Sequence, residues 1–295
     1  MMNKLKLSYE GNKVIFSHDE FHPKHILECG QAFRWYKEED ESYTLIAFNR
    51  VINVKNIDGN VIINGTNEVE FKELWYSYFD LETDYRKIKS ELPINEDLIA
   101  ASEYGYGIRI LNQDIYETII SFIISANNMI PRIKGSIEKI SNLYGEKIGE
   151  DENRQYYSFP KKEILANANP LDLREKCRVG FRDVRIVEAS RMLLQPDFAE
   201  NKLRELSTTE LRKKLIELPG VGPKVSDCIM LFAFGRSEVF PVDVWIKRVM
   251  ETLFINKEVK PKEVVEYANA LFGKNAGYAQ QYLFYYGRDN AIGKA

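Results

Sequence analysis

Cysteine and long apolar runs are scarce in this sequence of 295 residues. Its three cysteines, Cys29, Cys177 and Cys228, form no CxxC pair, which excludes an even-numbered disulfide framework and suits a reducing compartment. They are too few for an iron–sulfur cluster, which typically takes four thiolates. No apolar stretch approaches the ~20 residues that cross a bilayer, and residues 1–8 lack the apolar segment of a secretory signal. We therefore expect a cytoplasmic protein with no membrane partner.

Histidine is nearly absent as well. Because the only histidines are His18, His22 and His25, chemistry elsewhere must proceed without imidazole, which excludes a Ser-His-Asp triad and a zinc-binding HExxH helix. Their spacing is compatible with one helical face, but Pro23 disfavours a regular helix there. No cysteine or carboxylate pattern completes a metal site. We expect solvated surface histidines and no bound metal.

An excess of basic charge is also missing. The chain has 41 Lys and Arg against 44 Asp and Glu, a net charge of −3 and a pI of about 5.9. Taken alone, this balance disfavours a nucleic-acid-binding protein, since such domains are often strongly basic. Hydrophobic residues at 44% and charged residues at 29% are typical of a globular protein and exclude a disordered or fibrous one.

The sequence pattern changes along the chain from β-rich to helical. Short runs rich in Val, Ile, Tyr and Phe occur at residues 13–16, 32–36, 43–48, 51–55 and 61–64. Asp58-Gly59, between two such runs, predicts a hairpin turn. Helical spacing begins at Glu68 and recurs at residues 114–127, 131–144, 182–194, 208–218, 223–234, 242–254, 261–272 and 276–286. We predict an α+β protein with a β-rich N-terminal domain, residues 1–110, and a larger helical domain, residues 111–295.

Residues 218–224, Leu-Pro-Gly-Val-Gly-Pro-Lys, lie between two predicted helices of a hairpin spanning residues 208–235. Gly220 and Gly222 permit a tight turn and close approach of a ligand to the backbone. The second helix then presents its N-terminal N–H groups as an anion site. The string predicts a helix-hairpin-helix that binds DNA phosphate, and the alternative is an ordinary corner between two helices.

Two charged residues near this hairpin are candidates for chemistry. Lys224 falls in the first turn of the second helix, where it is suited either to contact phosphate or to act as an amine nucleophile. Asp243 follows nineteen residues later in Pro241-Val242-Asp243, at a predicted helix start that stabilises a carboxylate. Alone, Asp243 would be read as a simple helix-terminal residue; paired with the hairpin lysine, it indicates a catalytic site.

The hairpin, Lys224 and Pro241-Val242-Asp243 together resemble the helix-hairpin-helix/Gly-Pro-Asp superfamily of DNA glycosylases. Further segments resemble the 8-oxoguanine DNA glycosylase/lyases of that superfamily over nearly the whole chain: residues 29–35 (CGQAFRW), 107–114 (GIRILNQD), 121–128 (SFIISANN), 157–160 (YSFP), 180–182 (GFR) and 276–280 (AGYAQ). The resemblance implies a twisted, antiparallel, TBP-like N-terminal sheet with helices, followed by two helical lobes that flank a base pocket.

The resemblance also implies a mechanism. The enzyme would flip the damaged guanine out of the duplex, because the glycosidic bond is inaccessible within the stack. Lys224 would attack the anomeric carbon, displace the base and form a Schiff base, and β-elimination would then cleave the strand. Asp243 would stabilise the positive charge that develops on the sugar.

Four residues match the family's base pocket. The Gly30 carbonyl would accept the hydrogen on the imidazole-ring nitrogen, which 8-oxoguanine has and guanine lacks. Gln280 would bond the Watson–Crick edge, while Phe284 and Cys228 would pack on the two sides of the base. Without the resemblance, Phe284 and Cys228 would be read as ordinary core residues.

The resemblance assigns further residues to DNA. Asn127, Arg132 and Arg182 match contacts to the base opposite the lesion, and either arginine is alternatively an exposed surface cation. The sequence departs from the family pattern at Met129, where an Asn is frequent, at Phe181, where a wedge Tyr is common, at Trp245, which replaces a His, and at Gly287, which replaces an acid. We expect Phe181 and Trp245 to face DNA and cytosine opposite the lesion to be preferred less sharply than in typical members.

The implied partner is duplex DNA containing 8-oxoguanine, bound by a monomer with no required cofactor. The backbone of the hairpin is a candidate site for a monovalent cation, as in relatives. An alkylated-base glycosylase is an alternative that lacks the lysine, and a non-catalytic DNA-binding module is one that would leave Asp243 and Gln280 without roles. An iron–sulfur glycosylase is disfavoured because no cysteine follows Cys228.

The local charge of the hairpin differs from that of the whole chain. Residues 211–224 carry four basic side chains and one acidic one, a net charge of +3: Arg212, Lys213, Lys214 and Lys224 against Glu217. Much of the remaining contact would come from uncharged backbone N–H groups. We therefore expect few phosphate–cation contacts and a shallow salt dependence of binding.

Overall fold

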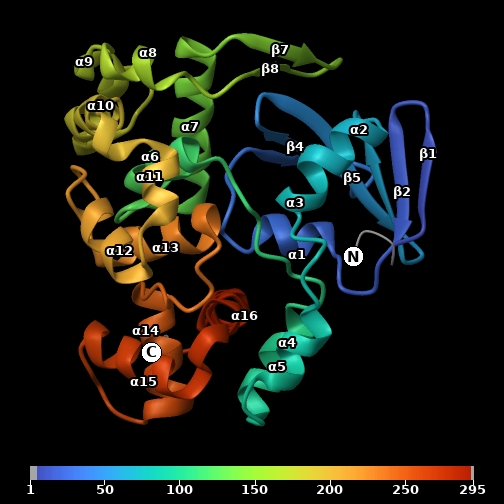
Figure 1. The fold of residues 1–295 in the computed structure, drawn as a ribbon, viewed down its shortest axis with the longest axis vertical. Coiled ribbons are helices and arrows are strands. Elements are labelled where there is room, and N and C mark those ends of the chain that lie inside the picture. The colour runs from blue at the N-terminus through green and yellow to red at the C-terminus, as the bar shows by residue number, and fades with distance from the viewer. Residues whose placement is uncertain (1–4, 294–295) are drawn as a thin grey trace.

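The computed structural model describes residues 5–293, and its N-terminal part is built on one antiparallel sheet (Figure 1). The strands lie in the order β1-β2-β6-β5-β4-β3. Their bounds are β1 Leu7–Glu10, β2 Lys13–Ser17, β3 Trp35–Lys37, β4 Tyr43–Ala47, β5 Arg50–Ile57 and β6 Asn60–Asn64. Asp58 and Gly59 join β5 to β6 with φ angles of +52° and +80°, the left-handed backbone of a tight hairpin turn, so the predicted turn is confirmed.

Alternation along the strands creates the core of this sheet. In β2, for example, Val14 and Phe16 are buried while their neighbours are more exposed, because successive side chains point to opposite faces. The buried face packs on short helical segments: α1 Pro23–Glu28, a π-helical turn Phe71–Trp75 and α3 Tyr76–Tyr78. The short helix α2 Glu68–Glu70 precedes the π-helical turn and contributes no buried residue. Phe71 and Trp75 are fully buried there.

The segment that contains the histidines differs in part from the prediction. As expected, no regular helix carries all three histidines, because α1 begins only at Pro23, a position where the missing N–H of proline costs nothing, and His18 and His22 precede it. The three histidines are half-buried, and the rings of His22 and His25 stack with centroids 4.1 Å apart. Burial lowers the pKa of His18 and of His22 to about 4. The prediction of solvated surface histidines was therefore wrong.

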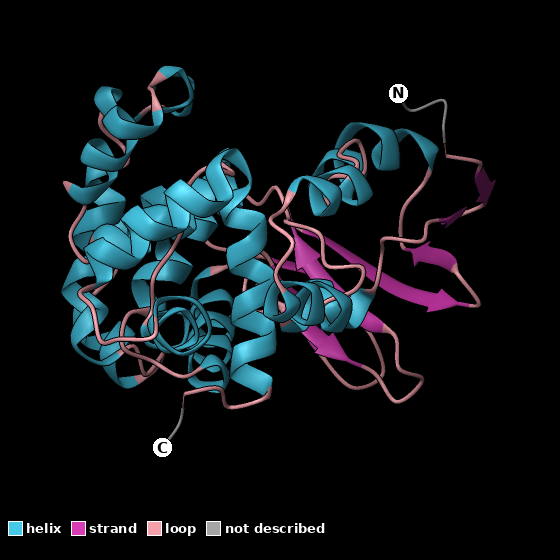
Figure 2. Cartoon of the chain, turned by 90° about the horizontal axis from the view of Figure 1, so that it is seen from below, coloured by secondary structure: helices cyan, strands magenta, loops and turns pink. Residues whose placement is uncertain are grey.

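Helices make up most of the rest of the chain (Figure 2). Their bounds are α4 Tyr85–Glu91, α5 Glu96–Tyr104, α6 Ile115–Ser125, α7 Ile130–Tyr144, α8 Lys162–Ala166, α9 Pro170–Glu175, α10 Asp183–Met192, α11 Glu200–Glu205, α12 Thr208–Ile216, α13 Pro223–Phe234, α14 Val244–Met250, α15 Pro261–Phe272 and α16 Ala276–Asp289. The predicted α+β class, an antiparallel sheet followed by a larger helical part, is confirmed. None of the helices in residues 5–293 is both long and apolar enough to cross a membrane.

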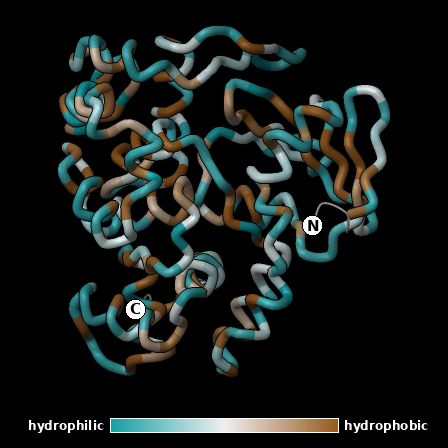
Figure 3. The backbone as a smooth tube through the Cα atoms, in the orientation of Figure 1, coloured by the Kyte–Doolittle hydropathy of each residue, from teal (hydrophilic) through white to brown (hydrophobic). Residues whose placement is uncertain are grey.

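The helices form two apolar cores. Helix α6 is buried along most of its length and packs on α7, α10 and α13. Helices α14, α15 and α16 form a second core, which α5 joins from the N-terminal part. Apolar residues, brown in Figure 3, run through both helical groups and along the sheet. The N-terminal ends of α13 and α14, the middle of α16 and the residues that follow α1 line one hollow, which is the candidate site.

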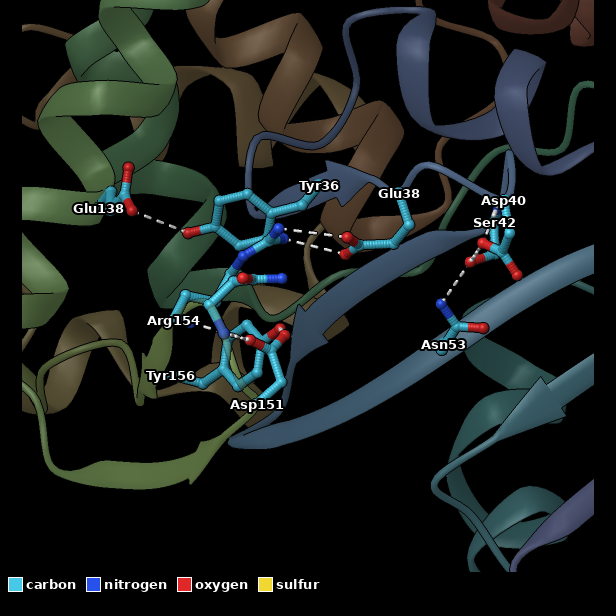
Figure 4. A network of polar contacts seen from close by, with 10 residues as sticks. Tyr36, Glu38, Asp40, Ser42, Asn53, Glu138, Asp151, Arg154 and Tyr156 are labelled. Atoms are coloured by element: carbon cyan, nitrogen blue, oxygen red, sulfur yellow. Dashed lines mark hydrogen bonds and ion pairs between the residues drawn. The ribbon is translucent and has the colours of Figure 1, made fainter.

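A second, two-stranded sheet interrupts the helical part and was not predicted. Strands β7 Lys147–Glu150 and β8 Gln155–Tyr157 extend toward the N-terminal sheet (Figures 1 and 4). Arg154 donates to both carboxylate oxygens of Glu38, at 2.9 and 3.2 Å, and its guanidinium lies 4.4 Å from the Tyr36 ring centroid. Tyr36 in turn donates to Glu138 of α7 at 3.0 Å. These contacts join the β7–β8 hairpin and helix α7 to the N-terminal sheet.

Candidate active site

The loop between α12 and α13 has the predicted helix-hairpin-helix form. Ser207 caps α12 in a reciprocal capping box with Glu210. Gly220 has a φ of +90°, and a Cβ there would lie 3.0 Å from Ile123 Cγ2, so both conformation and space require glycine. Gly222 has an extended backbone and no neighbour within 4 Å of an added Cβ. No side chain caps α13 among the described residues, and its first N–H groups remain available to an anion.

Lys224 lies in the first turn of α13, half-buried beside a thiol. Cys228 stands one turn further on and is 4% exposed. Burial raises the pKa of the Cys228 thiol to about 11, although the ammonium of Lys224 acts in the opposite direction. The Lys224 Nζ is also 5.4 Å from the ring centroid of Phe122. The amine is thus held between a neutral thiol and an aromatic ring, with no carboxylate within ion-pair distance among residues 5–293.

Asp243 is the N-cap of α14, and its side chain accepts a hydrogen bond of 2.8 Å from the Ile246 N–H. This bond fixes the carboxylate at the N-terminal end of the helix, where the dipole favours negative charge. Asp243 and Lys224 line the same hollow. The structure therefore brings the predicted pair together from two helices.

The hollow also contains the four residues of the predicted base pocket. Its lining is Cys29, Gly30, Phe122, Lys224, Cys228, Phe232, Pro241, Asp243, Gln280, Gln281 and Phe284. Gly30 has a φ of +84°, and an added Cβ would approach Phe284 Cε1 to 3.0 Å. Gln280 is 5% exposed, and its Oε1 accepts no hydrogen bond within the described residues. A buried amide oxygen without a partner is costly, which indicates that it serves a ligand.

Sequence reasoning missed several lining residues, namely Cys29, Phe122, Phe232, Pro241 and Gln281. Cys29, Phe122 and Pro241 lie inside motifs quoted above, but their side chains were not distinguished from core residues. Phe232 and Gln281 carry no such signal. Phe122 and Phe232 stack with ring centroids 5.5 Å apart and form an apolar wall.

Comparison with known proteins identifies the family. Residues 13–119 match the family model "8-oxoguanine DNA glycosylase, N-terminal domain", and residues 120–274 match "HhH-GPD superfamily base excision DNA repair protein". The chain belongs to the 8-oxoguanine DNA glycosylase/lyase family of the HhH-GPD superfamily. Its members include enzymes named N-glycosylase/DNA lyase, and this chain is a bifunctional glycosylase/lyase of that type.

Three relatives illustrate the likeness. A probable N-glycosylase/DNA lyase of Methanothermobacter thermautotrophicus is 32% identical over 72% of this chain and 74% of its own. A structure of MBOgg1 in complex with a low-affinity DNA ligand has 44% identity and a TM-score of 0.94, covering 98% of this chain and 99% of the other. The Clostridium acetobutylicum 8-oxoguanine glycosylase/lyase, in complex with duplex DNA containing cytosine opposite 8-oxoG, has 40% identity and a TM-score of 0.93, covering 97% and 98%.

A second hollow of this glycosylase/lyase adjoins the pocket on the side of the α6–α7 loop. It is lined by Gly30, Phe33, Phe122, Ser125, Ala126, Asn127, Asn128, Ile130, Ile133, Lys224, Asp243, Val244, Trp245 and Phe284. Asn127 is exposed with a φ of +51°. Trp245 also lines this hollow, with the Arg248 guanidinium 5.8 Å from its ring centroid. The exposed Arg132 is not part of this lining.

Phe181 and Arg182 belong to the short 3-10 helix Gly180–Arg182, which directly precedes α10. Arg182 is 6% exposed, and its guanidinium donates to the carbonyls of Ala126, Asn127 and Val179. The alternative of an exposed surface cation is therefore wrong for Arg182, whose side chain supports the α6–α7 loop. Phe181 is 53% exposed, with the Arg182 guanidinium 4.3 Å from its ring centroid.

Gly287 has a packing role in the glycosylase. A Cβ on this residue of α16 would lie 2.2 Å from Val249 Cγ2 of α14. Only glycine permits this close approach of the two helices.

No group of three or more His, Cys, Asp or Glu side chains within residues 5–293 is arranged to hold a metal ion.

Proposed function

We propose that this enzyme excises 8-oxoguanine from duplex DNA and then cleaves the abasic strand by β-elimination. The observation that carries the proposal is one hollow in which an amine, a carboxylate and a buried, unpartnered amide oxygen converge: Lys224, Asp243 and Gln280. The first two suit the chemistry at the sugar, and the third suits recognition of a base. The related Clostridium enzyme, bound to DNA with 8-oxoG, supports this substrate.

Lys224 acts as the nucleophile in the proposed reaction. Its neutral amine forms a bond to the anomeric carbon as the glycosidic bond breaks, and the base leaves with the bonding electrons and takes up a proton. Opening of the sugar ring transfers a proton from the new C–N nitrogen to the ring oxygen and leaves a Schiff base. Loss of a proton from C2′ then expels the 3′ phosphate, and water hydrolyses the imine to release Lys224.

Asp243 stabilises the positive charge that develops on the sugar while the glycosidic bond breaks. The Ile246 N–H holds its carboxylate in place before substrate binds, so little reorganisation is needed in the transition state.

The base pocket recognises the lesion from several sides. The Gly30 carbonyl accepts the extra ring hydrogen of 8-oxoguanine and faces the lone pair of guanine unfavourably. Gln280 bonds the Watson–Crick edge, and Phe284 and Cys228 enclose the base. The side chains of Phe284 and Cys228 both line the hollow. Phe284 lies beside Gly30, and Cys228 lies beside Lys224.

The remaining surface residues bind the duplex. The hairpin backbone at Gly220 and Gly222 contacts phosphate and is a candidate cation site, Phe181 wedges into the stack, and Trp245 faces the backbone. Asn127, Arg132 and Arg182 serve the opposite base, Arg182 through the loop that it supports. With the exposed Met129 beside them, this set is expected to prefer cytosine only moderately. The protein acts as a cytoplasmic monomer without a required cofactor.

Borohydride trapping tests the nucleophile. The wild-type protein should form a covalent adduct with a duplex that contains 8-oxoguanine, and Lys224→Gln should form none. Lys262→Gln is the matched control, because Lys262 is 88% exposed on α15 and its one ion pair within residues 5–293 is with Glu266. An adduct that persists in Lys224→Gln would refute this nucleophile, and absence of any reaction with this lesion in wild type would refute the substrate.

A further inference from the structure

We propose that Gln281 and Arg288 are positioning residues for base discrimination, because they hold the loop that carries the Gly30 carbonyl. This inference rests on the proposed role of Gly30. Both residues belong to α16 and do not need to touch the base. They act on the backbone of residues 28–31 at the C-terminal end of α1, where Cys29 and Gly30 line the pocket.

The backbone before Gly30 is held by two donors from α16. Gln281 Nε2 donates to the Cys29 carbonyl at 2.7 Å, and this side chain is 2% exposed. Arg288 Nη1 donates to the Glu28 carbonyl at 2.9 Å. The partners are separated by more than 250 residues in sequence, so only the tertiary fold creates this contact.

The backbone after Gly30 is held from the other side. Gln113 Nε2 donates to the Gln31 carbonyl at 2.8 Å. The Gln31 side chain donates to the carbonyls of Ile26 and Arg109 and accepts from the Leu111 N–H at 2.8 Å. Within residues 28–31, Gly30 therefore has the one carbonyl to which no group in the described part of the chain donates.

A fixed carbonyl discriminates better than a mobile one. Guanine and 8-oxoguanine differ at this contact by a lone pair in place of an N–H group, so discrimination requires that the carbonyl cannot turn away from the lone pair. Hydrogen bonds on both neighbouring peptides, to the carbonyls of Cys29 and Gln31, limit that rotation. This is preorganisation by a supporting shell of hydrogen bonds.

Helix α16 combines recognition and support on adjacent faces. Gln280 and Phe284, four residues apart, line the hollow. Gln281 and Arg288, seven residues apart, lie on a neighbouring stripe of the helix, and Gln281 reaches the edge of the same hollow. The Arg288 guanidinium also lies 5.6 Å from the Phe284 ring centroid. A single rigid helix thus sets the spacing between the base-edge contact and the carbonyl.

The test compares duplex affinities in a Lys224→Gln background, which binds without cleaving. Gln281→Met keeps the length of the side chain and removes its donor. The affinity ratio between 8-oxoguanine and guanine duplexes should fall roughly tenfold, the value of about one net hydrogen bond. The affinity ratio between 8-oxoguanine and abasic duplexes should fall as well, because an abasic site presents no base to the Gly30 carbonyl and therefore loses nothing when that carbonyl is released. Arg288→Met should lower both ratios less, because its side chain is 20% exposed.

Asn112→Leu is the matched control, since it removes an amide-to-carbonyl bond of 2.8 Å to Ser77 outside the pocket, and both ratios should stay unchanged. Unchanged ratios in Gln281→Met and Arg288→Met, or an equal loss of affinity for all three duplexes, would overturn the inference alone. If the Lys224→Gln parent binds the 8-oxoguanine and guanine duplexes equally, the proposed function itself fails. Should Gln281→Met not fold, Arg288→Met decides the matter.

Discussion

At the residue scale, some side chains of this site are suited to the chemistry and others hold them in position. Lys224 is placed beside Cys228 and Phe122, while the Asp243 carboxylate is fixed by its role as a helix cap. Asp243 therefore has two functions in one side chain, a structural one through Oδ1 and a proposed electrostatic one toward the sugar. Substitution by an amide separates the two.

Asp243→Asn should reduce the rate of 8-oxoguanine excision by about 100-fold or more, because a preorganised charge at the sugar is lost. Asparagine caps helices about as well as aspartate, so thermal stability and duplex affinity should be retained. Single-turnover excision, a melting curve and a binding isotherm measure the three quantities. Normal excision by the variant would show that the carboxylate has no such role.

At the scale of elements, the hairpin contains two glycines with different reasons to be glycine. The fold requires glycine at position 220, because the φ angle there is +90° and an added Cβ would lie only 3.0 Å from Ile123 Cγ2. Gly222 has an extended backbone and open space around it, so the fold tolerates a side chain there. Close approach of a phosphate to the N-terminus of α13 is the remaining reason for Gly222.

Gly220→Ala and Gly222→Ala should therefore behave differently. Gly220→Ala should destabilise the protein by about 1–3 kcal/mol through backbone strain, which lowers the melting temperature by several degrees. Gly222→Ala should keep the wild-type melting temperature and weaken duplex binding. Calorimetry and a binding assay separate the two effects. Equal duplex affinity of Gly222→Ala and wild type would indicate that no phosphate lies against this backbone.

At the scale of the whole molecule, the net charge of −3 coexists with a locally basic hairpin. Two of its four basic side chains are already paired: Arg212 with the buried Asp227 at 2.7 Å and Lys214 with Glu217 at 2.8 Å. Fewer free cations face the duplex than the local count of basic residues indicates. Binding must then depend more on backbone N–H groups, which carry no formal charge.

The affinity of the Lys224→Gln variant for duplex DNA should therefore fall by less than about 100-fold between 50 and 200 mM salt, which corresponds to about four phosphate contacts or fewer. A salt titration by fluorescence anisotropy measures the slope. The Arg212→Gln variant should change that slope little, since Asp227 already neutralises this side chain. A loss of about 1,000-fold or more would contradict the expectation.

Local sequence signals were sufficient for most elements of the helical part. The predicted segments 223–234 and 261–272 match α13 and α15 at both ends. In each, a proline in the first turn marks the start of the helix and a glycine after the last turn marks its end. The hairpin turn at Asp58-Gly59 was equally local. The β7–β8 hairpin was missed, since its partners Tyr36 and Glu38 lie more than 100 residues away.

By itself, the sequence determined the fold class, the helix-hairpin-helix and the pairing of Lys224 with Asp243, because each depends on residue types at short, recognisable spacings. The tertiary structure alone decided which side chains have partners. It buried Arg182 against the α6–α7 loop and left the Oε1 of Gln280 without a partner among the described residues. It also placed Gln281 and Arg288 against the carbonyls of the two residues that precede Gly30. Hydrogen bonds and burial depend on distances between remote segments, and no local pattern encodes those distances.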